Sequence, residues 1–327
     1  MQHGKFVLDD LERVAETTTP YLLTDYIPTA SIGILVGEWG IGKSPFALQM
    51  QLSMATGRPF MGRWLPAKDR IRCLYIDMEN GPRALLKVLT VLRKHIGAPD
   101  MGAFEMYSPN YIPREPGLEN ISEYHYILHL IKKDPVDFVI IDPLRLFQPQ
   151  AEAKNSEAAA MIQKLRDIIS EAGSTIMFIH HPRKIGSDPT IERFHLDTNP
   201  TEWMSNACGA ASLVQNADFR IGLEDTEDGL VVCRRFIRNL GWQPAEYIDR
   251  TYDDPDSTEP TGYVLKLGIE QLKPQEKNWL LQLNKTFQTG DFFTVCNKSK
   301  RRTHEILKRW ESLGVIVGGR RGEWRQA

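Results

Sequence analysis

One stretch of the sequence has the residue types and the spacing of a phosphate-binding loop. Residues 37–46 read GEWGIGKSPF, which fits the pattern Gly-x-x-x-x-Gly-Lys-Ser between an apolar run, ILV, and a helix-like run, FALQMQL. Gly37, Gly40 and Gly42 would let backbone N–H groups turn inward around phosphate oxygens. A strand before the loop and a helix after it favour a nucleotide site over a simple glycine-rich turn.

Two side chains of this loop would carry the chemistry. We expect Lys43 to reach the β- and γ-phosphates of ATP, and the Ser44 hydroxyl to bind Mg²⁺. Trp39 occupies a variable position of the pattern, and Pro45 falls in the first helical turn, where a missing N–H costs little. Neither unusual residue argues against a site for ATP and Mg²⁺.

Two later runs end in carboxylates. VIID ends in Asp142, which we expect to hold Mg²⁺ through water, although a buried strand can also end in Asp as a simple cap. YIDMEN places Glu79 just after the strand that follows the loop helix. A carboxylate there can deprotonate the attacking water, so Glu79 is the candidate general base. The alternative for Glu79 is an ordinary exposed acid in a loop.

The run TIMFIHHPRK ends in two histidines and two cations. We expect His180 to lie near the γ-phosphate and to sense it through a hydrogen bond, and Arg183 and Lys184 to open a long loop. A histidine pair also suggests a metal site, but a third ligand at a suitable spacing is missing from the sequence.

These residues need a scaffold of buried strands. Short apolar runs predict strands at 31–36, 72–77, 137–142 and 175–180, and helix-like stretches separate them. This alternation predicts an α/β fold with a parallel, doubly wound sheet and helices on both faces. Later β-rich runs predict strands at 218–224, 230–238 and 263–268, with an acidic loop at 251–262.

The composition is ordinary for a soluble, cytoplasmic protein, with 42% hydrophobic and 25% charged residues. The four cysteines show no C-x-x-C spacing, which favours reduced thiols over a disulfide framework or a zinc ribbon. The apolar runs fall short of the roughly 18 residues that a membrane span needs, and the first residues do not resemble a signal peptide.

The C-terminal end is basic. Residues 298–327 contain nine Lys or Arg and three Asp or Glu, a balance of +6 on a chain of net charge -2, so the preceding residues carry -8. Such a basic end suggests an anionic partner such as nucleic acid, or else a solvated charged surface.

The pattern after Lys273 predicts a winged-helix domain at 271–327, following an ATPase domain at 1–270. A helix candidate, a short helix, a polar turn and a basic helix from about residue 299 to 313 precede a glycine-rich hairpin. The cations expected to contact duplex DNA are Lys300, Arg301, Arg302, Lys308 and Arg309 in the helix, with Arg320 and Arg321 in the wing. A protein-docking module is the alternative.

Five motifs in order resemble one family of ATPases. GEWGIGKS, YIDMEN, VIIDPLRLF, FIHHPRK and CGAASLVQNADFRIGLE, within about residues 18–270, are similar to the RecA-like ATPases of plasmid RepA-type replicative helicases, relatives of DnaB helicases. The resemblance implies a hexameric ring, ATP bound between subunits and single-stranded DNA in the central channel. It places Lys43, Ser44, Glu79, Asp142 and His180 at the ATP site, and Arg183 and Lys184 in the loop that faces the channel.

The sequence departs from this family in two places. The family supplies a basic finger in trans from a K-x-R/N-x-G pattern, but RRFIRNLG has Ile237 at the lysine position, with Arg235 and Arg238 nearby and Arg220 as a third candidate. The C-terminal winged helix is also absent from the minimal RepA-type ring.

The expected function is a DNA helicase or translocase ATPase in the replication of a plasmid or phage. Two alternatives stay open: an ATP-switched DNA-binding regulator or loader that does not unwind, and a RecA-like recombination or repair mediator.

Overall fold

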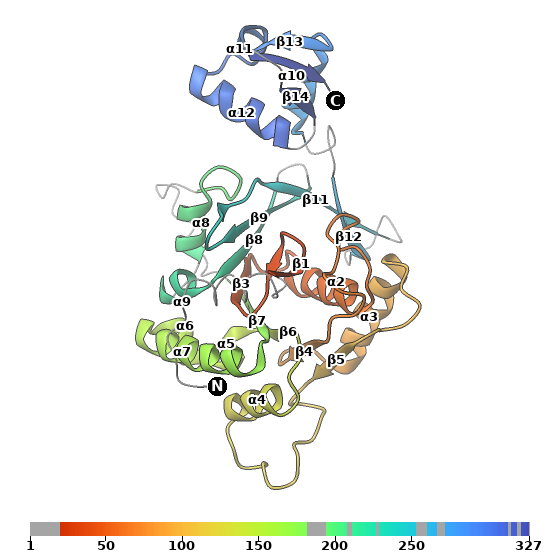
Figure 1. Ribbon diagram of the computed structural model, residues 1–327, viewed down its shortest axis with the longest axis vertical. Coiled ribbons are helices and arrows are strands. Elements are labelled where there is room, and N and C mark those ends of the chain that lie inside the picture. Colours follow the sequence, from red (N-terminus) through yellow and green to blue (C-terminus); the bar gives the residue numbers. More distant parts are fainter. Residues whose placement is uncertain are drawn as a thin grey trace, which may run out of the picture.

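A mixed sheet of ten strands forms the centre of the molecule, as the computed structural model in Figure 1 shows. The structure describes residues 20–181, 194–207, 211–226, 229–252, 260–266, 272–312, 315–318 and 322–326. Along the sheet the strand order is β12-β11-β9-β8-β3-β7-β6-β4-β5, and β10 pairs with β9. The strand that enters the glycine loop, β3, therefore has neighbours on both sides.

Six neighbouring strands of this sheet run parallel. They are β5 (Phe104–Tyr107), β4 (Cys73–Asp77), β6 (Phe138–Asp142), β7 (Thr175–His180), β3 (Ile32–Gly37) and β8 (Phe219–Asp225). Antiparallel strands extend the sheet beyond β8: β9 (Val231–Ile237), β10 (Gly241–Trp242), β11 (Glu246–Thr251) and β12 (Gly262–Leu265). A small hairpin, β1 (Tyr21–Leu23) with β2 (Ile27–Pro28), precedes the sheet.

Helices cover both faces of the sheet. One face carries α2 (Lys43–Ala55) and α3 (Pro82–His95). The other face carries α4 (Glu123–Lys133), α7 (Asn155–Ala172), α8 (Pro200–Ala207) and α9 (Ala211–Asn216). The short helices α5 (Leu144–Phe147) and α6 (Pro149–Ala153) follow β6. Within the described residues, none of the helices is long and apolar enough to span a membrane.

Side chains of each parallel strand alternate between two hydrophobic clusters. Ile34 and Val36 of β3 belong to the cluster under α4 and α7, whereas Leu35 belongs to the cluster under α2 and α3. This alternation is the geometry of a strand buried on both faces. The α/β fold with a mostly parallel, two-sided sheet confirms the predicted fold class.

The C-terminal residues form a small unit with its own core. Its helices are α10 (Pro274–Leu281), α11 (Thr289–Cys296) and α12 (Lys300–Ser312), and its strands are β13 (Thr286–Gln288), β14 (Ile316–Gly318) and β15 (Glu323–Gln326). The three strands pair in the order β13-β15-β14. Trp279, Phe292, Leu307 and Trp310 are buried in a cluster separate from those of the sheet. The winged-helix interpretation of this unit stays a prediction.

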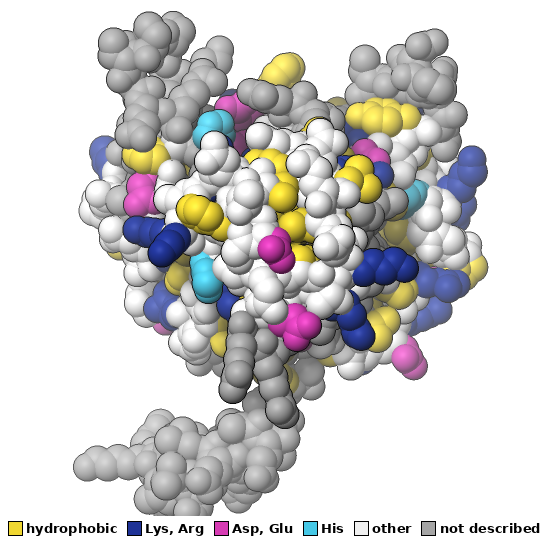
Figure 2. Space-filling model, turned by 90° about the horizontal axis from the view of Figure 1, so that it is seen from above, with side chains coloured by type: hydrophobic (Ala, Val, Ile, Leu, Met, Phe, Trp, Pro, Cys, Tyr) yellow, Lys and Arg dark blue, Asp and Glu magenta, His cyan; other side chains and the backbone are white. Residues whose placement is uncertain are grey.

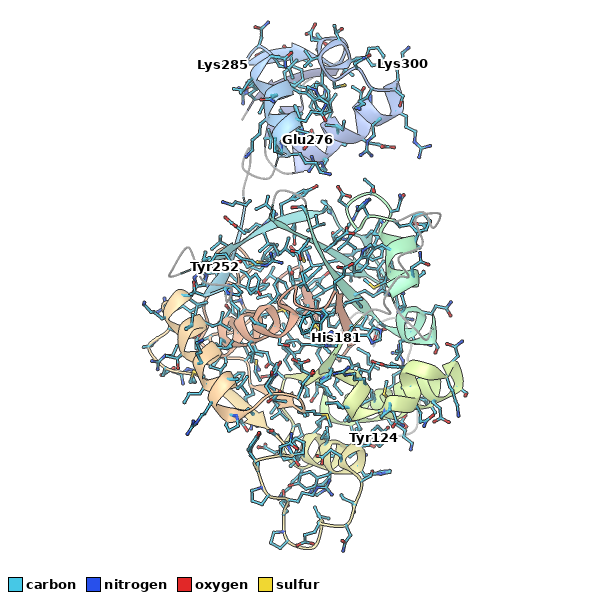
Figure 3. All side chains as sticks on the ribbon, turned by 180° about the vertical axis from the view of Figure 1, so that it is seen from behind. Tyr124, His181, Tyr252, Glu276, Lys285 and Lys300 are labelled. Atoms are coloured by element: carbon cyan, nitrogen blue, oxygen red, sulfur yellow. The ribbon has the colours of Figure 1, made fainter. Side chains whose placement is uncertain are left out.

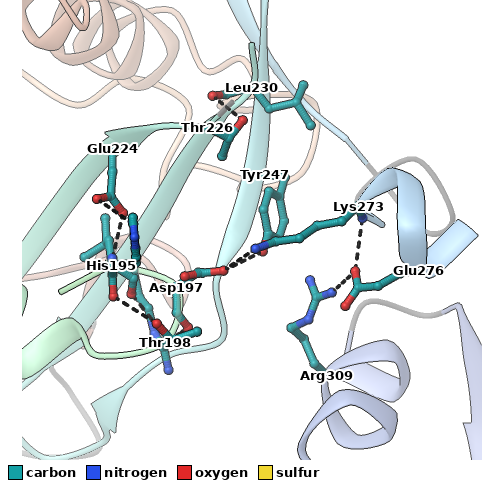
Figure 4. A network of polar contacts seen from close by, with 12 residues as sticks. His195, Asp197, Thr198, Glu224, Thr226, Leu230, Tyr247, Lys273, Glu276 and Arg309 are labelled. Carbon is teal, nitrogen blue, oxygen red and sulfur yellow. Dashed lines mark hydrogen bonds and ion pairs between the residues drawn. The ribbon is translucent and has the colours of Figure 1, made fainter. Parts of the chain in front are cut away.

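Lys273 and Arg309 of this unit contact residues of the part that carries the sheet. Lys273 Nζ lies 2.9 Å from Asp197 Oδ2, and the guanidinium of Arg309 lies 5.4 Å from the ring centre of Tyr247 in β11 (Figure 4). Arg309 also pairs with Glu276 at the start of α10. Beside these contacts, a cleft of about 1010 Å³ separates α12 from the strands.

Candidate nucleotide-binding site

The glycine loop joins the end of β3 to the start of α2. Gly40 and Gly42 have left-handed backbones, with φ of 83° and 93°. A Cβ on Gly42 would lie 2.1 Å from the hydroxyl of Tyr263, so both the conformation and the space require glycine. The N-terminus of α2 points backbone N–H groups into the curve of this loop, which is the arrangement that binds phosphate.

Lys43 lies inside the loop rather than in solvent. Its side chain is buried, and Nζ donates to the carbonyl oxygens of Gly37 at 2.7 Å and Glu38 at 2.8 Å. Burial lowers the pKa of Lys43 to about 8, although the carboxylates of Asp142 and Glu79 oppose this shift. The ammonium group is thus already positioned at the loop, close to two acids on neighbouring strand ends.

Three side chains form the candidate magnesium site. Tyr75 donates its hydroxyl to Asp142 Oδ2, and the Ser44 hydroxyl bonds the same carboxylate. Burial raises the pKa of Asp142, while the bonds from Ser44 and Tyr75 act in the opposite direction. All three groups lie on the α2 side of the sheet, because side chains of β4 and β6 alternate.

This donor set suits Mg²⁺ bound together with a nucleotide. Mg²⁺ in such sites takes one or two protein oxygens and fills its octahedron with water and phosphate oxygens. Ser44 would supply its hydroxyl oxygen to such an ion, and Asp142 would hold it through water. Across the described parts of the chain, no group of three or more His, Cys, Asp or Glu forms an all-protein metal cage.

Glu79 is positioned by the turn that follows β4. Asp77 is buried, and its Oδ1 accepts from the backbone N–H of Asn80 at 3.1 Å and from Asn80 Nδ2 at 3.0 Å. This turn leaves Glu79 at the carboxyl edge of the sheet, where its Oε1 accepts from Arg145 Nη2 at 2.9 Å. Sequence reasoning missed Arg145, whose only signal is its place three residues after Asp142.

The two histidines point in different directions. His180 ends β7 on the same face as Phe178, is buried, and lies 2.9 Å from Glu152 of α6 through Nδ1. Burial lowers the pKa of His181 to about 4, and the charges of Lys43, Glu79 and Arg145 also act on this pKa. Figure 3 shows His181 in the interior of the ATPase domain. The sequence predicted His180 near the γ-phosphate, but the structure places His180 beside Glu152 and His181 beside Lys43, Glu79 and Arg145.

The antiparallel strands support the loop from behind. Tyr263 of β12 donates its hydroxyl to the carbonyl of Gly42 at 2.9 Å. The side-chain amide of Gln49 exchanges two 2.8 Å hydrogen bonds with the backbone of Tyr263, which ties α2 to β12. Arg250 of β11 donates to the carbonyl of Ile41 at 3.3 Å.

Among the finger candidates, Arg235 occupies a position that a trans-acting residue cannot use. It is buried, its Nη2 lies 2.6 Å from Glu246 Oε1, and its guanidinium covers the ring of Tyr26 at 4.1 Å. A group enclosed by its own subunit cannot reach a neighbour, so the structure argues against Arg235 as the finger. Arg220 likewise stacks on Phe236 of its own subunit, at 4.2 Å.

Arg238 is the candidate that faces outward. Its side chain is 49% exposed, and its Nε lies 3.0 Å from Asp218 Oδ1. Asp218 also accepts from the backbone N–H of Ile32, where β3 begins. Arg238 therefore lies near the amino-terminal end of β3, whereas the glycine loop of its own chain follows the carboxyl-terminal end of that strand.

The remaining predicted residues fall into two groups. Arg183, Lys184, Arg320 and Arg321 lie outside the described residues. Lys300, Arg301 and Arg302 occupy the exposed first turn of α12. Arg301 and Arg302 both pair with Glu305, at 3.0 and 3.1 Å, which partly neutralises this basic turn.

Two solved structures and one family profile are similar to this chain. Similar solved structures include a KaiC-like protein from Pyrococcus horikoshii, 15% identical at a TM-score of 0.44, with 75% of this chain and 93% of that chain covered. Another is the RadB recombinase, 16% identical at a TM-score of 0.44, with coverages of 68% and 88%. The family profile described as an AAA domain matches residues 2–187, which is more than half of the chain. On this match the protein is a P-loop ATPase and belongs to the AAA domain family.

Proposed function

We propose that this protein is a Mg²⁺-dependent ATPase that couples hydrolysis to movement along DNA, as a replicative helicase of a plasmid or phage. The observation that carries the ATPase part is the convergence of Lys43, Asp142 and Glu79 at one edge of the sheet. Lys43 and Glu79 lie close enough for the acid to shift the pKa of the lysine, and Asp142 acts on it in the same way.

In this mechanism each side chain has one task. Lys43 would neutralise charge on the β- and γ-phosphates, and Ser44 and Asp142 would hold Mg²⁺, which would add positive charge there. Glu79 accepts a proton from water as the water oxygen attacks the γ-phosphorus and the bond to the β-phosphate oxygen breaks. His181, neutral at pH 7, is suited to accept or donate one hydrogen bond beside the reacting groups.

A ring of subunits supplies the missing charge in trans. Hydrolysis of ATP gains from an arginine at the developing negative charge, and a head-to-tail ring brings a different face of the neighbour to each site. Arg238, half exposed and remote from its own loop, fits this requirement. The hexamer, by contrast, rests on the resemblance to RepA-type ATPases.

The C-terminal unit is the proposed duplex-binding part. Its helix α12 begins with Lys300, Arg301 and Arg302, and its arrangement of three helices and three strands fits a winged helix. Figure 2 views the whole molecule from the end that carries this unit, and Lys and Arg side chains lie on both sides of that view. Single-stranded DNA is proposed to bind elsewhere, in the ring channel.

Strand displacement on a forked substrate tests the helicase proposal. We expect single-stranded DNA to stimulate hydrolysis, and the parent protein, but not Lys43→Ala, to displace the strand with ATP. DNA-stimulated hydrolysis without displacement would favour the regulator or loader, or a recombination mediator. Hydrolysis that does not respond to any DNA contradicts the proposed coupling.

A further inference from the structure

Arg145 and Glu79 form an ion pair at the ATP site. The Nη2 atom of Arg145 lies 2.9 Å from Oε1 of Glu79, and the two side chains are 50% and 40% exposed. Arg145 stands in α5, which begins two residues after the end of β6 at Asp142. Arg145 is therefore paired with the proposed base, Glu79, and follows the proposed metal ligand, Asp142, by three residues in the chain.

The pair belongs to the same electrostatic cluster as the phosphate-binding lysine. His181 responds to the charges of Lys43, Glu79 and Arg145, and Lys43 responds to the charge of Glu79. Arg145 is thus an arginine of the same subunit beside the groups that we expect at the γ-phosphate. No role was predicted for Arg145 from the sequence, because an arginine after Asp142 is not part of the glycine-loop pattern.

An exposed ion pair contributes little to stability, so stability alone does not account for this one. The Glu79 oxygen that accepts from Arg145 is occupied, so it is less available to the proton of an attacking water. A terminal phosphate carries more negative charge than a carboxylate and offers two oxygens to a guanidinium, so it is the stronger partner. The γ-phosphate of ATP would therefore compete with Glu79 for Arg145.

We propose that Arg145 is a positioning residue that holds Glu79 while the γ-phosphate is absent and moves to the γ-phosphate when ATP binds. The transfer frees the Glu79 carboxylate to accept the proton of the attacking water. This inference rests on the proposed ATPase mechanism and adds an arginine in cis to it. It predicts discrimination between ATP and ADP, because ADP has no γ-phosphate to draw Arg145 away.

Nucleotide affinity tests this transfer without relying on turnover. Dissociation constants for a non-hydrolysable ATP analogue and for ADP are measured by calorimetry on the full chain. Arg145→Ala should weaken the analogue about 10-fold, the usual scale for one charge-assisted hydrogen bond, and leave ADP nearly unchanged. Glu79→Gln should tighten the analogue several-fold, because Arg145 no longer has to leave a carboxylate.

The double variant separates this role from a passive one. In Glu79→Gln/Arg145→Ala the gain from Glu79→Gln should disappear, so the two effects on the analogue are not additive. Arg145→Lys should lie between the parent and Arg145→Ala. Arg166→Ala is the matched control, since Arg166 is 38% exposed and pairs with Asp218 at the other edge of the sheet.

Equal loss of the analogue and of ADP in Arg145→Ala, or additive effects in the double variant, overturns the inference. Either result leaves the ATPase proposal standing if the parent binds and hydrolyses ATP. A parent protein that binds neither nucleotide would instead refute the proposed function, and the role of Arg145 with it.

Discussion

The hydroxyl of Tyr75 donates to Oδ2 of Asp142, across two adjacent parallel strands. The register of β4 and β6 pairs Asp77 with Asp142, so Tyr75 lies two residues before the strand partner of this carboxylate. Both side chains point to the α2 face, where Ser44 also bonds Asp142. A buried tyrosine thus fixes the direction of the proposed metal ligand.

Loss of the Tyr75 hydroxyl should weaken Mg²⁺ binding. In Tyr75→Phe, Asp142 keeps its charge but loses the bond that orients it, and such outer partners commonly contribute 10-fold or more to metal affinity. We expect the Mg²⁺ concentration for half-maximal ATPase activity to rise about 10-fold. Tyr107→Phe is the control, because Tyr107 also donates to a carboxylate, Glu123 at 3.0 Å, away from the loop. Equal Mg²⁺ requirements in parent and Tyr75→Phe would contradict this role.

The affinity for ATP should fall at alkaline pH. Burial places the pKa of Lys43 at about 8 in the nucleotide-free chain, and phosphate binds the charged form. Below pH 7 the lysine is already protonated, whereas above pH 8 binding must take up a proton, so affinity should drop up to about 10-fold per pH unit. Calorimetry from pH 7 to 9.5 measures this slope. Lys43→Ala should bind weakly at every pH, and a flat profile in the parent would argue against the assignment.

Glu79→Gln should keep nucleotide binding and lose hydrolysis. The amide has nearly the shape of the carboxylate but cannot accept the proton of the attacking water. The expected loss of turnover is about 100-fold or more, the scale of general base catalysis. Glu105→Gln is the control, because Glu105 is also a partly exposed acid paired with an arginine, Arg72 at 2.9 Å, away from the loop, and it should hydrolyse ATP at close to the parent rate. Parent-like turnover in Glu79→Gln would place the base elsewhere.

The sequence predicted the parallel half of the sheet well. The runs ending in Val36, Asp77, Asp142 and His180 are apolar on both faces, and each became a strand within one residue of its predicted bounds. The glycine loop was equally clear, because its backbone conformation needs glycine at Gly42. These signals are local, so they can be interpreted without knowing what packs against them.

The parts that the sequence did not predict depend on distant partners. No strand was predicted at 246–251, where EYIDRT has few apolar residues, yet β11 forms there and pairs with β9 and β12. Arg235 was predicted as a candidate finger, but in the fold it is buried against Glu246 and Tyr26. The pair of Arg145 with Glu79 joins residues 66 positions apart, a relation that composition and spacing do not encode.

Arg238→Ala should lower turnover while leaving nucleotide affinity nearly intact. An arginine supplied in trans acts on the transition state, and its loss typically costs about 10³-fold or more. Mixing Arg238→Ala with Lys43→Ala should restore activity, because some interfaces then combine an intact loop with an intact finger. No recovery at any mixing ratio contradicts action in trans.

Arg235→Ala is the informative contrast to Arg238→Ala. Removing one partner of a buried pair leaves Glu246 uncompensated, which costs roughly 3–5 kcal/mol of unfolding free energy. We therefore expect Arg235→Ala to be destabilised in denaturant titrations, and Arg238→Ala to unfold like the parent. An Arg235→Ala protein of parent-like stability would weaken the structural role assigned to this pair.

The basic turn of α12 should bind duplex DNA in a way that two opposite changes can test. Arg301 and Arg302 both pair with Glu305, so this acid competes with DNA phosphate for them. Joint replacement of Lys300, Arg301 and Arg302 by Ala should weaken duplex binding and flatten its salt dependence, by roughly 0.9 in slope for each lost phosphate contact.

Glu305→Gln should have the opposite effect on the same measurement, with tighter duplex binding, because both arginines lose their competitor. Lys285→Ala is the control, since Lys285 and Lys300 lie on opposite sides of the unit (Figure 3). Basal ATPase activity should stay unchanged in all of these variants, because none of the residues lies at the ATP site. Duplex affinity that responds to neither the triple change nor Glu305→Gln would indicate that the C-terminal unit docks onto protein, which favours a loader over a helicase that binds its own origin.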